Sequence, residues 1–141
     1  MTRALMLLIV VAAASSAAVE LSPCKLALKP AHENFANVES CKLQYKTELD
    51  KFISNTKCTH LPYDVATCDP LLYNYSKCAL KFIGVLKPDN TVDDVAFQKI
   101  LLQNKCSKDT NFAKAYPTCK SSTMKYLNVV QFIECLDKAV P

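Results

Sequence analysis

Apolar side chains recur at steps of three and four residues along much of the chain, which is the spacing of one face of an α-helix. Residues 37–54 carry a clear stripe of this kind, and Asn37 stands where it can cap the helix. The stripe consists of Val38, Cys41, Tyr45, Leu49 and Phe52. A second helix is predicted over residues 69–86, where Asp69 and Pro70 form a typical N-cap and first-turn pair.

Two more helices are predicted in the second half of the chain. Thr91 and Asp94 have the spacing of a capping box, which opens a helix that continues to about residue 103. The last helix is expected to begin after Ser121 or Ser122. Its apolar positions are Tyr126, Val130, Ile133 and Leu136.

Turn-forming residues concentrate in two predicted connectors, residues 59–63 and 107–117. The chain has one glycine, Gly84, and it contains no Asn-Gly or Asp-Gly pair. Tight β-hairpins depend on such pairs, so an all-β fold is disfavoured. The pattern predicts an all-α fold made of several short and medium helices.

The first 18 residues have the features of a secretory signal peptide. Arg3 gives a positive start, residues 5–14 are an apolar run, and residues 16–18 are small. We expect cleavage after Ala18, which leaves residues 19–141 as a single secreted domain. No later segment is long and apolar enough to predict a transmembrane helix.

Eight cysteines follow the predicted signal peptide, at positions 24, 41, 58, 68, 78, 106, 119 and 135. An even number of cysteines in a small secreted domain indicates a disulfide framework, here of four bridges. The spacing leaves their connectivity open, because eight cysteines can pair in about 105 ways. No two cysteines are closer than ten positions, whereas structural zinc sites use closely spaced pairs, so we expect no metal. The predicted fold is a small multi-helix domain stapled by disulfides.

The residues needed for catalysis are scarce. One glycine excludes phosphate-binding and dinucleotide-binding loops, and only two histidines, His32 and His60, are present. Asp93 and Asp94 are adjacent, so on a helix they diverge and cannot act on one substrate. After residue 18 every basic side chain is a scattered lysine, which disfavours nucleic-acid binding. We therefore expect no enzyme activity, no cofactor and no nucleic-acid partner.

The predicted helix over residues 69–86 has more apolar surface than one partner helix can cover. Either close packing on both sides or an enclosed ligand would satisfy this surplus. The second possibility predicts a cavity for part of a sterol or acyl chain between the helices. Its expected lining is Tyr63, Leu72, Tyr75, Phe82, Ile83, Leu86, Ile100, Leu101, Tyr126 and Val130.

Residues 38–106 resemble the elicitins, a family of small secreted all-helical proteins of oomycetes. The shared pattern begins with a Phe-containing helix ending in cysteine, a Leu-Pro pair and a short helix that leads to a second cysteine. A third cysteine then opens a helix, a turn and a Thr-Val pair follow, and a final helix ends in cysteine. Here these features are Phe52 with Cys58, Leu61-Pro62, Cys68, Cys78, the run from Phe82 to Val92, and Cys106. The chain departs from the pattern at Asn90, where the family has a cysteine, and in a tail that carries Cys119 and Cys135.

The resemblance implies a function and part of the disulfide pattern. The implied bridges are Cys58–Cys78 and Cys68–Cys106, with the order among Cys24, Cys41, Cys119 and Cys135 left open. The implied ligand is a sterol or a fatty acid. The implied role is the elicitation or modulation of host plant defence, including the hypersensitive response, by a secreted non-enzymatic protein.

Two other functions fit the same features. A secreted cysteine-rich effector or inhibitor with a solid core would act through surface contacts with a host protein. A carrier of hydrophobic ligands from an invertebrate secretion would need a cavity but no kinship with elicitins. A monomer is expected in each case.

Overall fold

The computed structural model describes residues 21–141. The predicted signal peptide, residues 1–18, and the first residues of the predicted domain lie outside the described part. Within residues 21–141 the chain forms helices and no β-strand, apart from an isolated bridge between Leu86 and Val92. The predicted all-α fold is confirmed.

The helices follow one another with short connections. They are α1 (Pro23–Ala36), α2 (Glu39–Gln44), α3 (Lys46–Ser54), α4 (Thr56–Thr59), α5 (Val65–Ile83), α6 (Asp94–Ala96), the π-helical η1 (Phe97–Leu101), α7 (Thr110–Thr123), the 3₁₀-helical η2 (Met124–Tyr126) and α8 (Val129–Ala139). The longest, α5, ends at Gly84, whose φ of 83° lies in the left-handed region that favours glycine.

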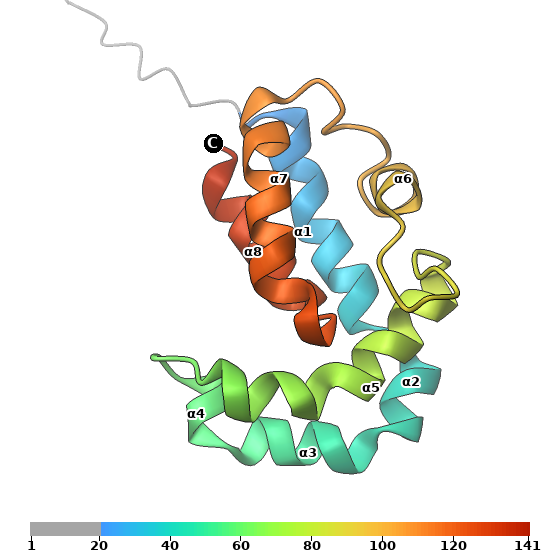
Figure 1. Cartoon of the computed structure of the whole chain (residues 1–141), viewed down its shortest axis with the longest axis vertical. Coiled ribbons are helices and arrows are strands. Elements are labelled where there is room, and N and C mark those ends of the chain that lie inside the picture. The colour runs from blue at the N-terminus through green and yellow to red at the C-terminus, as the bar shows by residue number, and fades with distance from the viewer. Residues whose placement is uncertain (1–20) are drawn as a thin grey trace, which may run out of the picture.

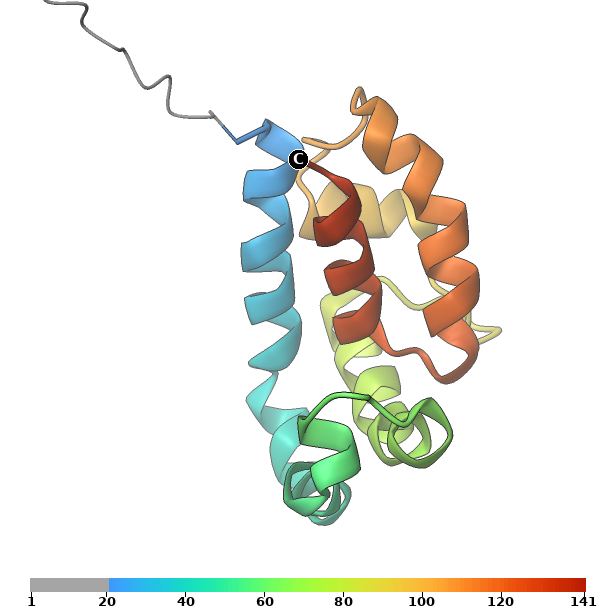
Figure 2. The same ribbon diagram turned by 90° about the vertical axis from the view of Figure 1, so that its left-hand side faces the viewer.

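Two layers of helices make up the fold (Figure 1). Helices α1, α7 and α8 stand side by side as an upright bundle, in which α8 packs on both α1 and α7. Helices α3 and α5 pack on each other and cross beneath this bundle. Figure 2 views α3 and the beginning of α5 nearly end-on, below the upright helices, while the later turns of α5 rise toward them. The junction of the two layers positions the site described below.

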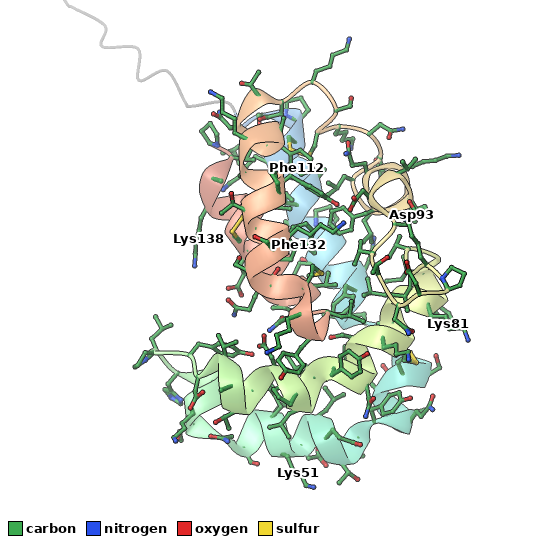
Figure 3. The ribbon with its side chains drawn as sticks, viewed as in Figure 1. Lys51, Lys81, Asp93, Phe112, Phe132 and Lys138 are labelled. Atoms are coloured by element: carbon green, nitrogen blue, oxygen red, sulfur yellow. A yellow bond between two sulfur atoms is a disulfide. The ribbon has the colours of Figure 1, made fainter. Side chains whose placement is uncertain are left out.

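An aromatic cluster fills the centre of the upright bundle. The ring of Phe132 lies 5.2 Å from the rings of both Phe97 and Tyr116, and Phe112 lies 5.2 Å from Tyr116. Figure 3 labels Phe112 and Phe132 within this bundle. Phe97 and Phe132 are fully buried, and each such side chain stabilises the fold by about 1.5–3 kcal/mol.

Four disulfides join the helices, as predicted. They are Cys24–Cys106, Cys41–Cys78, Cys58–Cys68 and Cys119–Cys135, and none of the eight cysteines is free. The first links the start of α1 to the segment after η1, the second links α2 to α5, the third links α4 to α5, and the last links α7 to α8.

The pairing implied by the elicitin resemblance, Cys58–Cys78 and Cys68–Cys106, is wrong. Cys68 and Cys78 lie on one helix, α5, and ten residues of helix span about 15 Å. The short α4 places Cys58 beside the beginning of α5, next to Cys68, and far from Cys78. Cys78 lies beside α2 instead, where it bonds to Cys41.

Several helix boundaries differ from the prediction. Helix α5 begins four residues earlier than expected, because Asp64 caps it by accepting a hydrogen bond from the Thr67 amide at 3.1 Å. Asp69 is therefore inside the helix and buried, and Pro70 follows it on an exposed position. Asn37 ends α1 and does not cap α2. Asp93, not Thr91, caps α6 through its carboxylate.

The predicted connector over residues 107–117 is wrong, because α7 already begins at Thr110. The Asp109 carboxylate accepts from the Phe112 amide at 2.9 Å and so caps the helix, which continues through Pro117. Helix α1 was not predicted; Ser22 caps it, Pro23 is its first residue, and Pro30 lies inside it. The last helix begins only at Val129, after a turn in which Leu127 has a positive φ of 55°.

Candidate ligand-binding groove

The ten side chains expected to line one cavity lie in different surroundings. Leu72, Tyr75 and Val130 line a groove, and Tyr63 contacts the end of this groove. The inward orientation expected for Phe82 is wrong, because its side chain is 71 % exposed, and Ile100 is 47 % exposed. Leu101 is buried in the core, and the half-buried side chains of Ile83 and Leu86 pack against that core. Tyr126 is half-buried as well, and its ring packs edge-on against Tyr73.

The groove lies at the junction of the two layers and has a volume of about 480 Å³. Ligand pockets in proteins commonly measure about 300–1,000 Å³. Four parts of the chain form its walls: the end of α1, the α2–α3 segment, the middle of α5 and the first turn of α8. The lining residues are Phe35, Ala36, Lys42, Lys46, Leu49, Asp50, Phe52, Ile53, Leu72, Tyr75 and Val130.

Helix α3 presents the least covered wall. Leu49, Phe52 and Ile53 follow at helical spacing and form one apolar face, yet α3 contains no buried residue. Ile53 is 66 % exposed, whereas Leu49 and Phe52 are half-buried. An apolar helix face is normally covered by a neighbouring element. Here the groove leaves part of this face open.

The opposite wall of the groove is rigid because Phe35 holds both the ring and the hydroxyl of Tyr75. Its ring packs edge-on against Phe35 with 5.7 Å between the ring centroids, and its hydroxyl donates to the Phe35 carbonyl oxygen at 2.9 Å. Burial raises the pKa of the Tyr75 hydroxyl, so the group stays neutral and remains a donor. Tyr75 therefore contributes an apolar ring to the groove, while its polar atom is already satisfied.

Charged groups lie at one end of the groove. Lys46 forms an ion pair with Asp50 at 2.5 Å, and both side chains are mostly exposed. Lys42 donates to Asn37 Oδ1 at 3.2 Å and lies 3.6 Å from a Glu39 carboxylate oxygen. Exposed pairs of this kind contribute about 0–1 kcal/mol. The groove thus combines apolar walls with two loosely held lysine side chains.

A buried polar cluster closes the other end. The Tyr63 hydroxyl and the Asn128 amide nitrogen both donate to Asp69 Oδ1, at 2.8 and 2.6 Å. The Tyr63 ring also packs at 6.5 Å from Phe52, a groove residue. Burial, and after it the hydrogen bond to Asp69, raises the pKa of Tyr63. The cluster joins the beginning of α8 to α5 and so fixes Val130 opposite the α3 wall.

The sequence carried signals for some of the groove residues that were not predicted. Ile53 widens the apolar stripe of residues 37–54, which is a sign of surface beyond what one partner helix covers. Asn128 precedes the apolar run of α8 and has the residue type of an N-cap; its Oδ1 accepts from the Gln131 amide at 3.1 Å. The contribution of Phe35 depends on α1, which the pattern did not predict.

Other clusters of polar side chains are weaker candidates for a binding site than the groove. Within residues 21–141 no group of three or more His, Cys, Asp or Glu side chains is placed to hold a metal ion. His60 is exposed, with its Nδ1 atom 3.0 Å from the Thr59 hydroxyl. A hollow of about 370 Å³ between α1 and α8 is lined by Leu28 and Ile133 together with Lys29, His32, Glu33, Glu134 and Asp137, so titratable side chains outnumber apolar ones there.

Taken together, residues 21–141 form a small all-α domain that is stapled by four disulfides and contains an apolar groove. None of the helices in this range combines the length and apolar character required to cross a bilayer. No family model, no curated protein and no solved structure matches the chain. The resemblance to elicitins stays a prediction.

Proposed function

We propose that the protein is a non-enzymatic binding protein that holds a small hydrophobic ligand, a sterol or a fatty acid, outside the cell. Four disulfides support an oxidising location, since such bridges persist in secreted proteins. The wider role implied by the resemblance, elicitation or modulation of plant defence, belongs to this proposal as its biological setting. A hydrophobic-ligand carrier unrelated to elicitins would use the same groove.

One observation carries the proposal: the apolar face of α3 lies open on a groove of ligand size. A hydrophobic ligand in the groove would cover Leu49, Phe52 and Ile53 and remove their apolar surface from water. Burial of apolar surface contributes about 25 cal/mol for each Å². The rigid Tyr75 wall lowers the cost of binding, because little reordering is needed when the ligand enters.

The test is saturable binding of a fluorescent sterol and a fluorescent fatty acid to the purified disulfide-bonded protein. We expect one site per chain and expect Ile53→Ser to weaken binding several-fold, since it places a hydroxyl on the apolar wall. Leu43→Ser is the matched control, because Leu43 is also exposed, at 71 %, and does not line the groove. Absence of saturable binding of either probe would contradict the proposal.

A different observation favours a second function, contact with a host protein. Three large apolar side chains outside the groove are exposed between the end of α5 and η1: Phe82, Val95 and Ile100. Exposed apolar side chains of this kind are common in protein–protein interfaces. An effector or inhibitor would bind its host protein through these residues. Replacing Phe82 and Ile100 with Ser would then abolish partner binding and leave ligand binding unchanged.

A further inference from the structure

We infer that the ligand is a single-chain amphiphile with a carboxylate head, of the long-chain fatty acid class, whose head binds Lys42 and Lys46 while its chain lies along Leu49, Phe52 and Ile53. This inference rests on the proposed function, because it names the chemistry of the ligand in the same groove. It distinguishes between fatty acids and neutral sterols, whereas the proposed function allows either class of ligand.

The groove has a polar end and an apolar end. Lys42 is on α2 and Lys46 is the first residue of α3, so both lysines lie where α3 begins. Phe52 and Ile53 follow six and seven residues later, about 10 Å farther along the helix. At that far end the Tyr63 ring packs on Phe52. A ligand that is charged at one end and apolar at the other matches this order.

Both lysines can bind a carboxylate without leaving a buried group unsatisfied. Each ammonium group has three N–H donors, so Lys42 can keep its hydrogen bond to Asn37 and donate to the ligand as well. The partner of Lys46 is Asp50, which is itself exposed and can be solvated when the ion pair opens. A carboxylate attached to a chain in the groove would stay close to the two lysines and compete well with Asp50.

A neutral head group would interact more weakly than a carboxylate with the lysine end of the groove. The hydroxyl of a sterol has no charge to balance the two ammonium groups, whereas a carboxylate accepts charge-assisted hydrogen bonds from both. Glu39 and Asp50 are the acidic groups beside the lysines, and they partly balance their charge in the free protein. The preference for a carboxylate therefore comes from direct hydrogen bonds and not from a long-range positive field.

The experiment compares two ligands with the same chain. Palmitate and palmityl alcohol displace a fluorescent fatty acid from the full disulfide-bonded protein, at concentrations below micelle formation, and a sterol is titrated in parallel. We expect palmitate to bind about tenfold more tightly than the alcohol, since charge-assisted hydrogen bonds are stronger than neutral ones. The double variant Lys42→Gln/Lys46→Gln should abolish this preference by weakening palmitate binding alone.

Two control variants make the result specific. Lys51→Gln removes an exposed lysine that points away from the bundle below α3 in Figure 3, and it should change neither affinity. Lys42→Arg/Lys46→Arg keeps the charge and should restore the preference for palmitate. Equal binding of palmitate and the alcohol, or a preference that persists in the double Gln variant, overturns the inference but leaves the proposed function intact. If palmitate, palmityl alcohol and the sterol all fail to bind, both the inference and the proposed function are overturned.

Discussion

The side-chain amide of Asn128 donates a hydrogen bond to Asp69 Oδ1 at 2.6 Å, although the two residues are 59 positions apart. The same oxygen accepts from the Tyr63 hydroxyl, and both Asp69 and Asn128 are almost fully buried. Asn128 also caps α8. One polar cluster therefore fixes the beginning of α8 on α5 and defines one end of the groove.

Replacing Asn128 with Ala should destabilise the protein by about 3 kcal/mol. The change removes the cap of α8, which contributes about 1 kcal/mol, and deprives a buried carboxylate of one donor. Tyr63→Phe removes only a donor and should lower the free energy of unfolding by about 1–2 kcal/mol. Urea unfolding measures both values. An Asn128→Ala protein as stable as the parent would show that the cluster does not hold the layers together.

The free energy of unfolding should decrease in acid, and Asp94 should contribute to the decrease. Burial raises the pKa of Asp94, but hydrogen bonds from Lys120 and Tyr116 outweigh burial and hold the pKa below its usual value of 3.8. Because the pKa is lower in the folded chain than in the unfolded one, this contribution is present above about pH 4 and is lost as the pH falls through the folded pKa.

The variant Asp94→Asn tests this contribution. It should be less stable than the parent at neutral pH, and the difference between the two proteins should shrink as the pH falls below about 4. Unfolding at a series of pH values provides the measurement. Asp109→Asn is a control, because Asp109 caps α7 but forms no ion pair with a lysine. A difference for Asp94→Asn that is constant with pH would contradict the assignment.

The two disulfides that differ most in sequence separation should differ in their contribution to stability. Cys24–Cys106 spans 82 residues and Cys58–Cys68 spans 10. Loop entropy in the unfolded chain gives about 4.5 kcal/mol for the first bridge and about 2.7 kcal/mol for the second. Ser substitutions of both partners should therefore lower the melting temperature more for Cys24 and Cys106. Peptide mapping without reduction should first recover the four pairs described above.

Phe52 and Phe82 provide a matched pair for separating ligand binding from folding. Phe52 lines the groove and contacts Tyr63, whereas Phe82 is exposed and outside it. Phe52→Ala should weaken fatty-acid binding several-fold and cost about 1–2 kcal/mol of stability, less than a fully buried Phe, since Phe52 is half-buried. Phe82→Ala should leave both unchanged. Binding titrations and thermal unfolding of the two variants give the comparison, and equal effects on binding would argue against the groove.

Local signals in the sequence predicted the helical character of the chain and the four disulfides. The stripe over residues 37–54 became α2 and α3, but it is broken at Tyr45, where the backbone leaves helical geometry. The cysteine count was sufficient for the number of bridges. Their connectivity was not predictable, because it depends on where the short α4 turns the chain toward α5 and places Cys58 beside Cys68.

The position of the groove depended on tertiary structure that the sequence pattern did not supply. Leu72, Tyr75 and Val130 were among the predicted lining residues, and Phe82 belonged to the same predicted helix as Leu72 and Tyr75. On α5, however, Phe82 lies seven residues beyond Tyr75, near the end of the helix, where no second layer covers it. The α1 wall with Phe35 was missing from the prediction, and the lysines of α2 and α3 were interpreted only as part of a scattered set of basic side chains.

Methyl NMR spectra of the protein titrated with palmitate test most directly whether a hydrophobic ligand binds between α3 and α5. Binding in the groove should cause saturable shifts of the methyl signals of Leu49, Ile53, Leu72 and Val130 and leave those of Val95 and Ile100 unchanged. Shifts confined to Val95 and Ile100, or no saturable shift at any methyl group, would contradict it.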